Sequence, residues 1–66
     1  MDELLLRKII KNKGMKYQFI ADKLGISRET LHNKITGKSE FTVTEMRGLT
    51  DILKLEFEEI QSVFFS

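Results

Sequence analysis

The sequence predicts an all-α protein built from five short helices. Three observations favour this fold class: apolar residues recur at helical spacing, strict alternation of apolar and polar residues is absent, and four glycines punctuate the pattern. The chain has 66 residues, of which 41% are hydrophobic, and it contains no cysteine. Because neither a disulfide nor a thiolate metal site can supply stability, apolar packing must form the core. We expect a single domain over residues 1–66.

Two helices are predicted in the first third of the chain. Residues 2–12 place four apolar side chains on one face, Leu5, Leu6, Ile9 and Ile10. Two acids open this segment and two lysines close it, as the helix dipole favours, and Gly14 ends it. The second helix spans residues 16–24, and Gly25 is expected to take the left-handed conformation after its last turn.

The third and fourth helices are predicted from their caps. Ser27 is a strong N-cap for a helix over residues 28–36. Thr42 and Glu45 form a T-x-x-E capping box, which opens a helix that ends near Leu53. Both helices carry an apolar stripe, so we expect each to bury one side.

The end of the chain is rich in phenylalanine. A last helix over residues 57–65 is expected to bury Ile60, Phe64 and Phe57. Phe65 falls on a different side of this helix, where it is available for a dimer contact.

The formal net charge of +1 hides an uneven distribution. Residues 7–38 hold nine basic and two acidic side chains and therefore carry +7. Residues 1–6 carry −2 and residues 39–66 carry −4. This asymmetry predicts one basic surface on an otherwise acidic molecule, so the low net charge does not exclude nucleic acid as a partner.

The most informative segment lies around Gly25. Five apolar side chains are expected to face inward, three before it and two after it: Ile20, Ala21, Leu24, Leu31 and Ile35. The glycine supplies a positive φ, Ile26 fills the corner, and the small Ala21 suits a close helix crossing. This spacing is typical of a helix-turn-helix, whose second helix enters the major groove of DNA.

A family resemblance covers most of the chain. The run QFIADKLGISRETL, residues 18–31, resembles the Cro and phage-repressor family of helix-turn-helix proteins. Residues 37–45 resemble the same family's loop and fourth helix, and residues 55–60 resemble its fifth helix. The resemblance implies a compact five-helix, lambda-repressor-like domain that binds operator DNA as a homodimer and regulates transcription.

The resemblance assigns base contacts to the helix predicted over residues 28–36. The family's first two recognition positions hold Arg28 and Glu29 here, and a third, four residues after the second, holds Asn33. Arg pairs with guanine, Asn with adenine and Glu with cytosine in the major groove. His32 flanks these residues, and its position is equally consistent with solvent and with DNA.

The resemblance also assigns phosphate contacts around the two helices. The family's positions hold Lys16, Tyr17, Thr36 and Lys38 here, and we expect phosphate contacts from Ser27 and Lys34 as well. Tyr17 stands where the family usually has Gln, so its hydroxyl can meet a phosphate but cannot brace Arg28 through an amide. Lys34 stands where many relatives have an aliphatic residue. With Ile35 taking the buried role, we expect Lys34 to be free to approach the DNA backbone.

Other function classes remain open to test. One alternative is a protein-binding adaptor or antirepressor of the same fold that uses the phenylalanine-rich end. An enzyme is the least expected class, because cysteine is absent and the one histidine lacks metal-ligand spacing. We expect no catalytic residue, cofactor, metal or small-molecule ligand.

Apolar runs of at most three residues predict no membrane segment. We expect a cytoplasmic protein of prokaryotic or phage origin.

Overall fold

Five α-helices form the protein, in the order that the sequence predicts. The computed structural model describes residues 1–66 and contains α1 (Glu3–Asn12), α2 (Tyr17–Leu24), α3 (Arg28–Ile35), α4 (Val43–Leu53) and α5 (Phe57–Phe64). No strand is present. The all-α class is confirmed, and no helix end differs from its predicted position by more than one residue.

Local hydrogen bonds explain where the helices begin. The Oδ1 atom of Asp2 accepts the backbone N–H of Leu5 at 3.0 Å, so Asp2 caps α1 rather than starting it. The Oγ atom of Ser27 accepts the backbone N–H of Thr30 at 3.0 Å and caps α3 as predicted. The predicted capping box at the start of α4 is also present.

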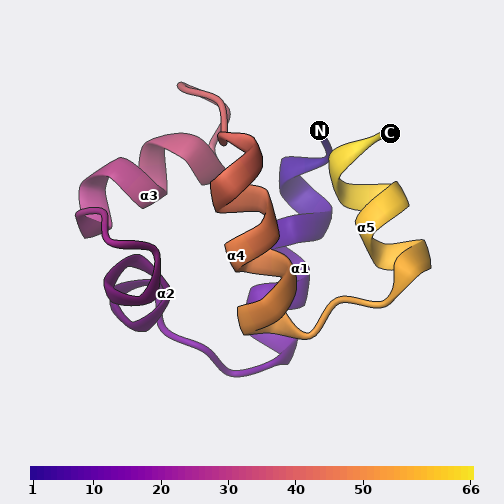
Figure 1. Cartoon of the computed structure of the whole chain (residues 1–66), viewed down its shortest axis with the longest axis horizontal. Helices are drawn as coiled ribbons and strands as arrows, with labels where there is room; N and C mark the ends of the chain where they lie inside the picture. The colour runs from indigo at the N-terminus through magenta and orange to yellow at the C-terminus, as the bar shows by residue number, and fades with distance from the viewer.

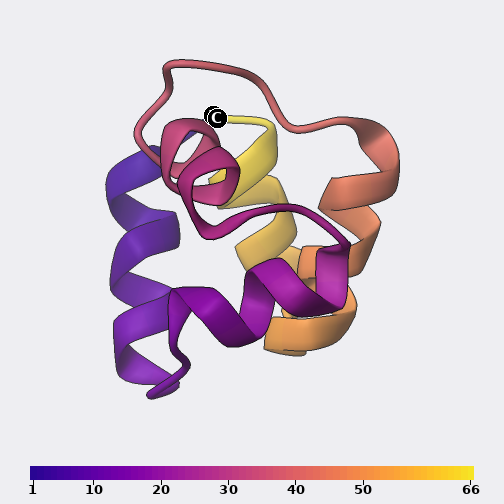
Figure 2. The same ribbon diagram turned by 90° about the vertical axis from the view of Figure 1, so that its left-hand side faces the viewer.

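The helix pair α2 and α3 lies at one end of the molecule. Figure 2 shows α2 running below α3, which is seen nearly end-on, with α1 and α4 on either side and α5 behind. In Figure 1, α5 lies at the opposite end, where it packs against α1. The backbone N–H of Asp2 donates to the carbonyl of Val63 at 2.7 Å, so the two ends of the chain are adjacent.

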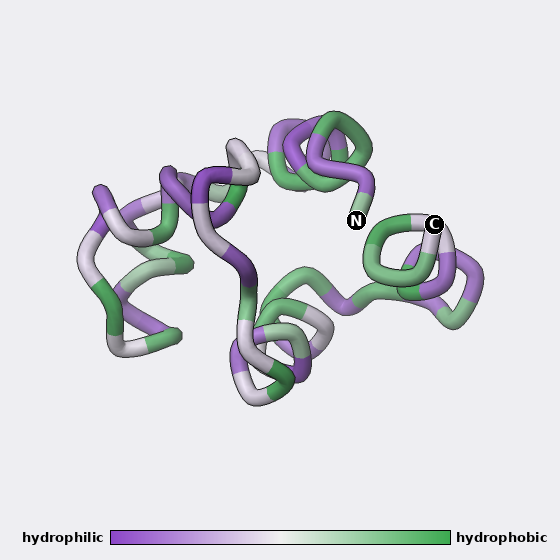
Figure 3. The backbone as a smooth tube through the Cα atoms, turned by 90° about the horizontal axis from the view of Figure 1, so that it is seen from above, coloured by the Kyte–Doolittle hydropathy of each residue, from purple (hydrophilic) through white to green (hydrophobic).

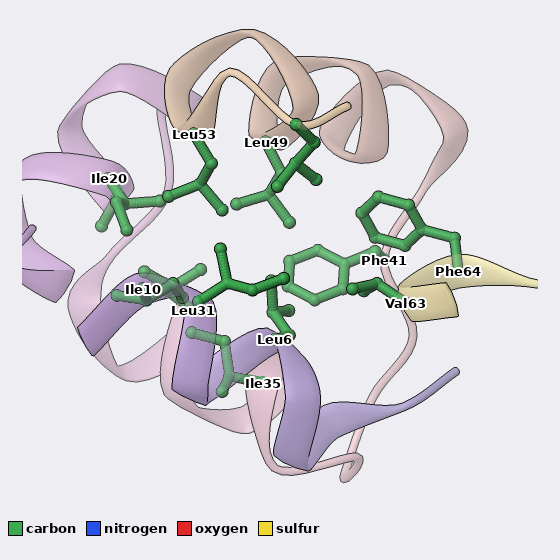
Figure 4. Close-up of a cluster of buried hydrophobic side chains, with 13 residues drawn as sticks. Leu6, Ile10, Ile20, Leu31, Ile35, Phe41, Leu49, Leu53, Val63 and Phe64 are labelled. Atoms are coloured by element: carbon green, nitrogen blue, oxygen red, sulfur yellow. The ribbon is translucent and has the colours of Figure 1, made fainter. Parts of the chain in front are cut away.

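The core consists of thirteen buried side chains, all hydrophobic, so no polar group needs a partner inside it. Every helix contributes at least one side chain that is fully buried, and these converge on a common centre (Figure 4): Leu6, Ile20, Leu31, Leu49 and Val63. Phe41, from the loop between α3 and α4, inserts its ring into the same cluster and is 5% exposed. The core therefore fixes α3 and the following loop against the rest of the chain.

The phenylalanines of α5 differ in part from expectation. Phe64 is buried and Phe65 is 68% exposed, as predicted. Phe57 is 71% exposed, so the expectation that it is buried is wrong. Phe57 and Phe64 lie within about 20° of each other around the helix axis, so they share a side of α5. They differ in their position along the helix, because Phe57 is its first residue and Phe64 its last, and only the last turn, with Val63 and Phe64, contributes buried side chains to the core.

Candidate nucleic-acid interface

A tight turn joins α2 to α3 at the predicted glycine. Gly25 has φ 73° and ψ 28°, in the left-handed region where glycine carries no Cβ penalty. The next N–H, that of Ile26, donates to the carbonyl of Ala21 at 3.1 Å and closes the end of α2. Ala21 is fully buried, and its small side chain permits the contact between α2 and α3. The turn thus sets the direction in which α3 leaves α2.

Helix α3 has one buried and one exposed side. Leu31 and Ile35 are fully buried, whereas Arg28, Glu29 and His32 are exposed. Residues four positions apart lie above one another on a helix, so His32 lies one turn beyond Arg28 on the same side. The residues that the sequence assigns to base contacts at the start of α3 therefore face away from the core.

A shallow hollow lies between the start of α2 and the exposed side of α3. Its lining residues are Tyr17, Arg28, Glu29 and His32. A neighbouring hollow shares Tyr17 and Arg28 and adds residues from the start of α2, Met15, Lys16 and Gln18. Tyr17 is half-buried and packs on the core cluster. The structure thus brings two predicted phosphate contacts, Lys16 and Tyr17, beside three predicted base contacts.

The remaining predicted residues of this surface lie at the other end of α3. The carbonyl of Asn33 accepts the backbone N–H groups of Lys38 at 2.8 Å and of Ser39 at 3.3 Å. The Thr36 hydroxyl donates to the carbonyl of His32 at 2.9 Å. The loop therefore folds back on the end of α3 and holds Lys38 near Asn33. Figure 3 shows that this loop is hydrophilic along most of its length.

Lys34 does not join these residues. Its Nζ atom lies 2.7 Å from Oε1 of Glu45 in α4 and donates to the carbonyl of Glu40 at 3.2 Å. Only 12% of its side chain is exposed. The expectation that Lys34 is free is therefore corrected: α4 supplies a carboxylate beside it, and the lysine turns toward that partner.

The carboxylate of Glu45 is held by more than Lys34. Its Oε1 atom also accepts the backbone N–H of Thr42 at 2.9 Å, which completes the capping box. Partial burial alone would raise the pKa of Glu45, but hydrogen bonds from Lys34 and Thr42, together with the charge of Lys34, lower the pKa overall. Glu45 is therefore ionised at neutral pH and pairs with a charged lysine.

Ser27 has a structural role at the start of α3. Its hydroxyl donates to Oγ1 of Thr30 at 2.8 Å and accepts the backbone N–H of the same residue. These bonds hold the first turn in which Arg28 and Glu29 lie. A phosphate contact by Ser27 remains a prediction.

Gln18 is a candidate that the sequence interpretation missed. It is exposed and lines the hollow beside Lys16 and Arg28. Its Nε2 atom donates to Oδ1 of Asp22, one turn later in α2, at 2.8 Å. The signal was present in the sequence, because the residue after Tyr17 must also lie in the first turn of α2.

Comparison with known proteins decides what this arrangement is. A family model described as the Cro/C1-type HTH DNA-binding domain matches residues 5–64. The chain belongs to this family. As a Cro/C1-type domain it is a DNA-binding protein, and α2 and α3 are its helix-turn-helix. A comparison with curated proteins and one with solved structures each found no significant match.

Two further observations apply to this Cro/C1-type domain. None of its five helices has the length and hydrophobicity needed to cross a bilayer. Seven residues line the two hollows, and five of them belong to α2 or α3, whereas no residue of α5 lines either hollow. The candidate interface thus lies at the end of the molecule where α2 and α3 lie (Figure 1).

Proposed function

We propose that residues 1–66 act as one sequence-specific regulator of transcription, of the phage-repressor or Cro type, with α3 in the major groove of duplex DNA. The observation that carries this proposal is the convergence of exposed Arg28 and Glu29 on α3 with Lys16 and Tyr17 at the start of α2. Arg, Glu and, one turn later, Asn33 are suited to guanine, cytosine and adenine edges. Each good contact contributes about 1–3 kcal/mol of discrimination.

Phosphate contacts on both sides of α3 support the same orientation. Lys16 and Tyr17 lie beside the first turn of α3, and the loop that follows α3 holds Thr36 and Lys38. Contacts to the DNA backbone position a protein on the duplex, and base contacts specify the sequence. With contacts to the DNA backbone at both ends of α3, this helix is held along the major groove in one register.

We also propose that two copies bind a two-fold operator. Phe57, the first residue of α5, is 71% exposed, and Phe65, which follows its last residue, is 68% exposed. These two exposed aromatic side chains offer apolar surface that a second copy can cover. The two recognition helices are then expected about 34–36 Å apart, one turn of DNA.

Selection of binding sites from a random duplex pool tests the proposal. We expect an enriched sequence with a two-fold repeat, and an affinity that falls steeply with salt because phosphate contacts release counterions. Arg28→Ala is expected to weaken binding to the selected duplex by about 1–3 kcal/mol and to relax one base position. Arg7→Ala is the matched control, since Arg7 is an exposed arginine on α1. No enrichment over random DNA would refute sequence-specific function.

The exposed phenylalanines favour one alternative, a protein-binding adaptor or antirepressor. Under this alternative, Phe65→Ser abolishes binding to the partner protein, and the double variant Arg28→Ala with Asn33→Ala leaves that binding unchanged. Under the proposed function, the double variant abolishes selective DNA binding and leaves self-association intact. The two variants therefore separate the two functions.

A further inference from the structure

The structure contains one ion pair, and it joins the proposed recognition helix to α4. Nζ of Lys34 and Oε1 of Glu45 are 2.7 Å apart, and their side chains are 12% and 14% exposed. The same Oε1 atom accepts the backbone N–H of Thr42 at 2.9 Å. The same Nζ atom donates to the carbonyl of Glu40 at 3.2 Å. Two atoms thus connect α3, the loop after it and the start of α4.

These contacts hold the loop between α3 and α4 at both of its ends. At the first end, the N–H groups of Lys38 and Ser39 donate to the carbonyl of Asn33. At the second end, Lys34 holds the carbonyl of Glu40, while Glu45 holds the N–H of the residue that caps α4. Lys38, a proposed phosphate contact, belongs to the first of these two attachments.

A direct phosphate contact by Lys34 conflicts with this arrangement. To reach DNA, its ammonium group has to leave the carboxylate of Glu45, which is only 14% exposed. Removing one partner from a buried or partly buried pair leaves an uncompensated charge, and that loss is larger than the gain of an exposed contact. The pair is therefore expected to persist when the surface meets DNA.

We propose that Lys34 is a positioning residue, which sets the loop that presents Thr36 and Lys38 to DNA and does not itself bind phosphate. This inference rests on the proposed function, because the loop matters only if it contacts DNA. The two roles predict opposite results for Glu45→Gln. If Lys34 contacts phosphate, the substitution frees the lysine, and binding is unchanged or tighter. If Lys34 positions the loop, the substitution loosens the loop, and binding is weaker.

The test compares binding of the full chain to the duplex that the wild-type protein selects, at several salt concentrations. The variants are Lys34→Met, Glu45→Gln and, as a control, Asp51→Asn, which removes a charge from the exposed side of the same helix. Gln can still accept the N–H of Thr42, so the capping box survives in Glu45→Gln. Circular dichroism verifies that each variant is folded, and Lys34→Met provides a second test that leaves the cap residues intact.

Both pair variants are expected to bind about fivefold more weakly than wild type. Each is also expected to make the plot of log affinity against log salt less steep. The magnitude of its negative slope falls by about 0.9, the contribution of one lost phosphate contact. If the pair of Lys34 and Glu45 only stabilised the fold, the two variants would bind DNA more weakly, but the slope would not change. The control Asp51→Asn is expected to match wild type in affinity and slope.

Amide hydrogen exchange in the free protein gives a measurement without DNA. The N–H groups of Lys38 and Ser39 are expected to exchange faster in both pair variants than in wild type. Unchanged exchange, unchanged or tighter binding by Glu45→Gln, or an unchanged salt slope would each overturn the positioning role. A wild-type chain that selects no duplex would instead overturn the proposed function, and the positioning role with it.

Discussion

Gly48 of α4 faces Leu24 of α2 so closely that a Cβ atom fits there only if the Leu24 side chain moves. A Cβ atom at Gly48 would lie 2.5 Å from Cδ2 of Leu24. Glycine inside a helix costs about 0.5–1 kcal/mol relative to alanine. The close packing of α2 on α4 offsets this cost. Because α2 also carries Lys16 and Tyr17, the same contact helps to place the start of the DNA-facing surface.

A double-mutant cycle tests this contact. Gly48→Ala alone is expected to change the free energy of unfolding little, because the gain in helix propensity is cancelled by displacement of the Leu24 side chain. In the Leu24→Ala background, Gly48→Ala is expected to stabilise the protein by about 1 kcal/mol. Urea unfolding followed by circular dichroism measures both. Equal effects in the two backgrounds would show that the residues are not coupled.

Lys54 ends α4 in a conformation that suits glycine better. It has φ 52° and ψ 50°, in the left-handed region, which costs a residue with a Cβ about 1–2 kcal/mol. Lys54→Gly is expected to raise the free energy of unfolding by about 0.5–1 kcal/mol, after the greater freedom of glycine in the unfolded chain is deducted. The control Lys54→Ala keeps the Cβ and is expected to show no gain in urea unfolding. An equal gain in both variants would place the strain in the lysine side chain.

The pairing of Glu45 makes stability depend on pH. Its pKa is lower in the folded protein than in the unfolded chain, so the folded state binds a proton there less readily. The resulting stabilisation is complete above the unfolded pKa, roughly 4.3, and is lost as pH falls through the lower folded pKa. Urea unfolding of wild type and Glu45→Gln from about pH 6 to about pH 3 measures it. Wild type is expected to be more stable at the upper end, and a difference that stays constant with pH would contradict this linkage.

The last two phenylalanines are expected to differ sharply when truncated. Phe64 is 8% exposed and belongs to the core cluster, whereas Phe65 is 68% exposed. Phe64→Ala is expected to cost about 3–5 kcal/mol, which is enough to abolish cooperative unfolding in a domain of this size. Phe65→Ala is expected to change stability by no more than about 0.5 kcal/mol. Thermal unfolding of both variants provides the comparison. Similar midpoint temperatures for the two variants would contradict the burial of Phe64.

The parts of the fold that depend on neighbouring residues were predictable from the sequence. Ser27 caps α3 through a residue three positions away, and Gly25 takes the positive φ that the end of α2 requires. Such short-range chemistry is visible in the sequence, which explains the agreement of the helix ends. The exposure of Arg28 and Glu29 then follows from helical register, because Leu31 and Ile35 must face the core.

Features that depend on contacts between separate helices were not predictable. The partner of Lys34 is eleven positions away in another helix, and nothing in the local pattern indicates it. Phe57 was misplaced because the stripe on α5 predicts which side of the helix is apolar but not which of its turns is buried in the core, and only the last turn is. The close approach of Gly48 to Leu24 also becomes visible only when the two helices are packed.

The hydrogen bond from Asp2 to Val63 has a practical consequence. It places the two chain ends together, and Met1 and Glu3 line a hollow with Gly37, Ser39 and Glu40 of the loop after α3. A fluorophore or an affinity tag attached at either end is therefore expected to emerge beside the loop that holds Lys38. Such a label needs a long flexible linker to stay clear of bound DNA.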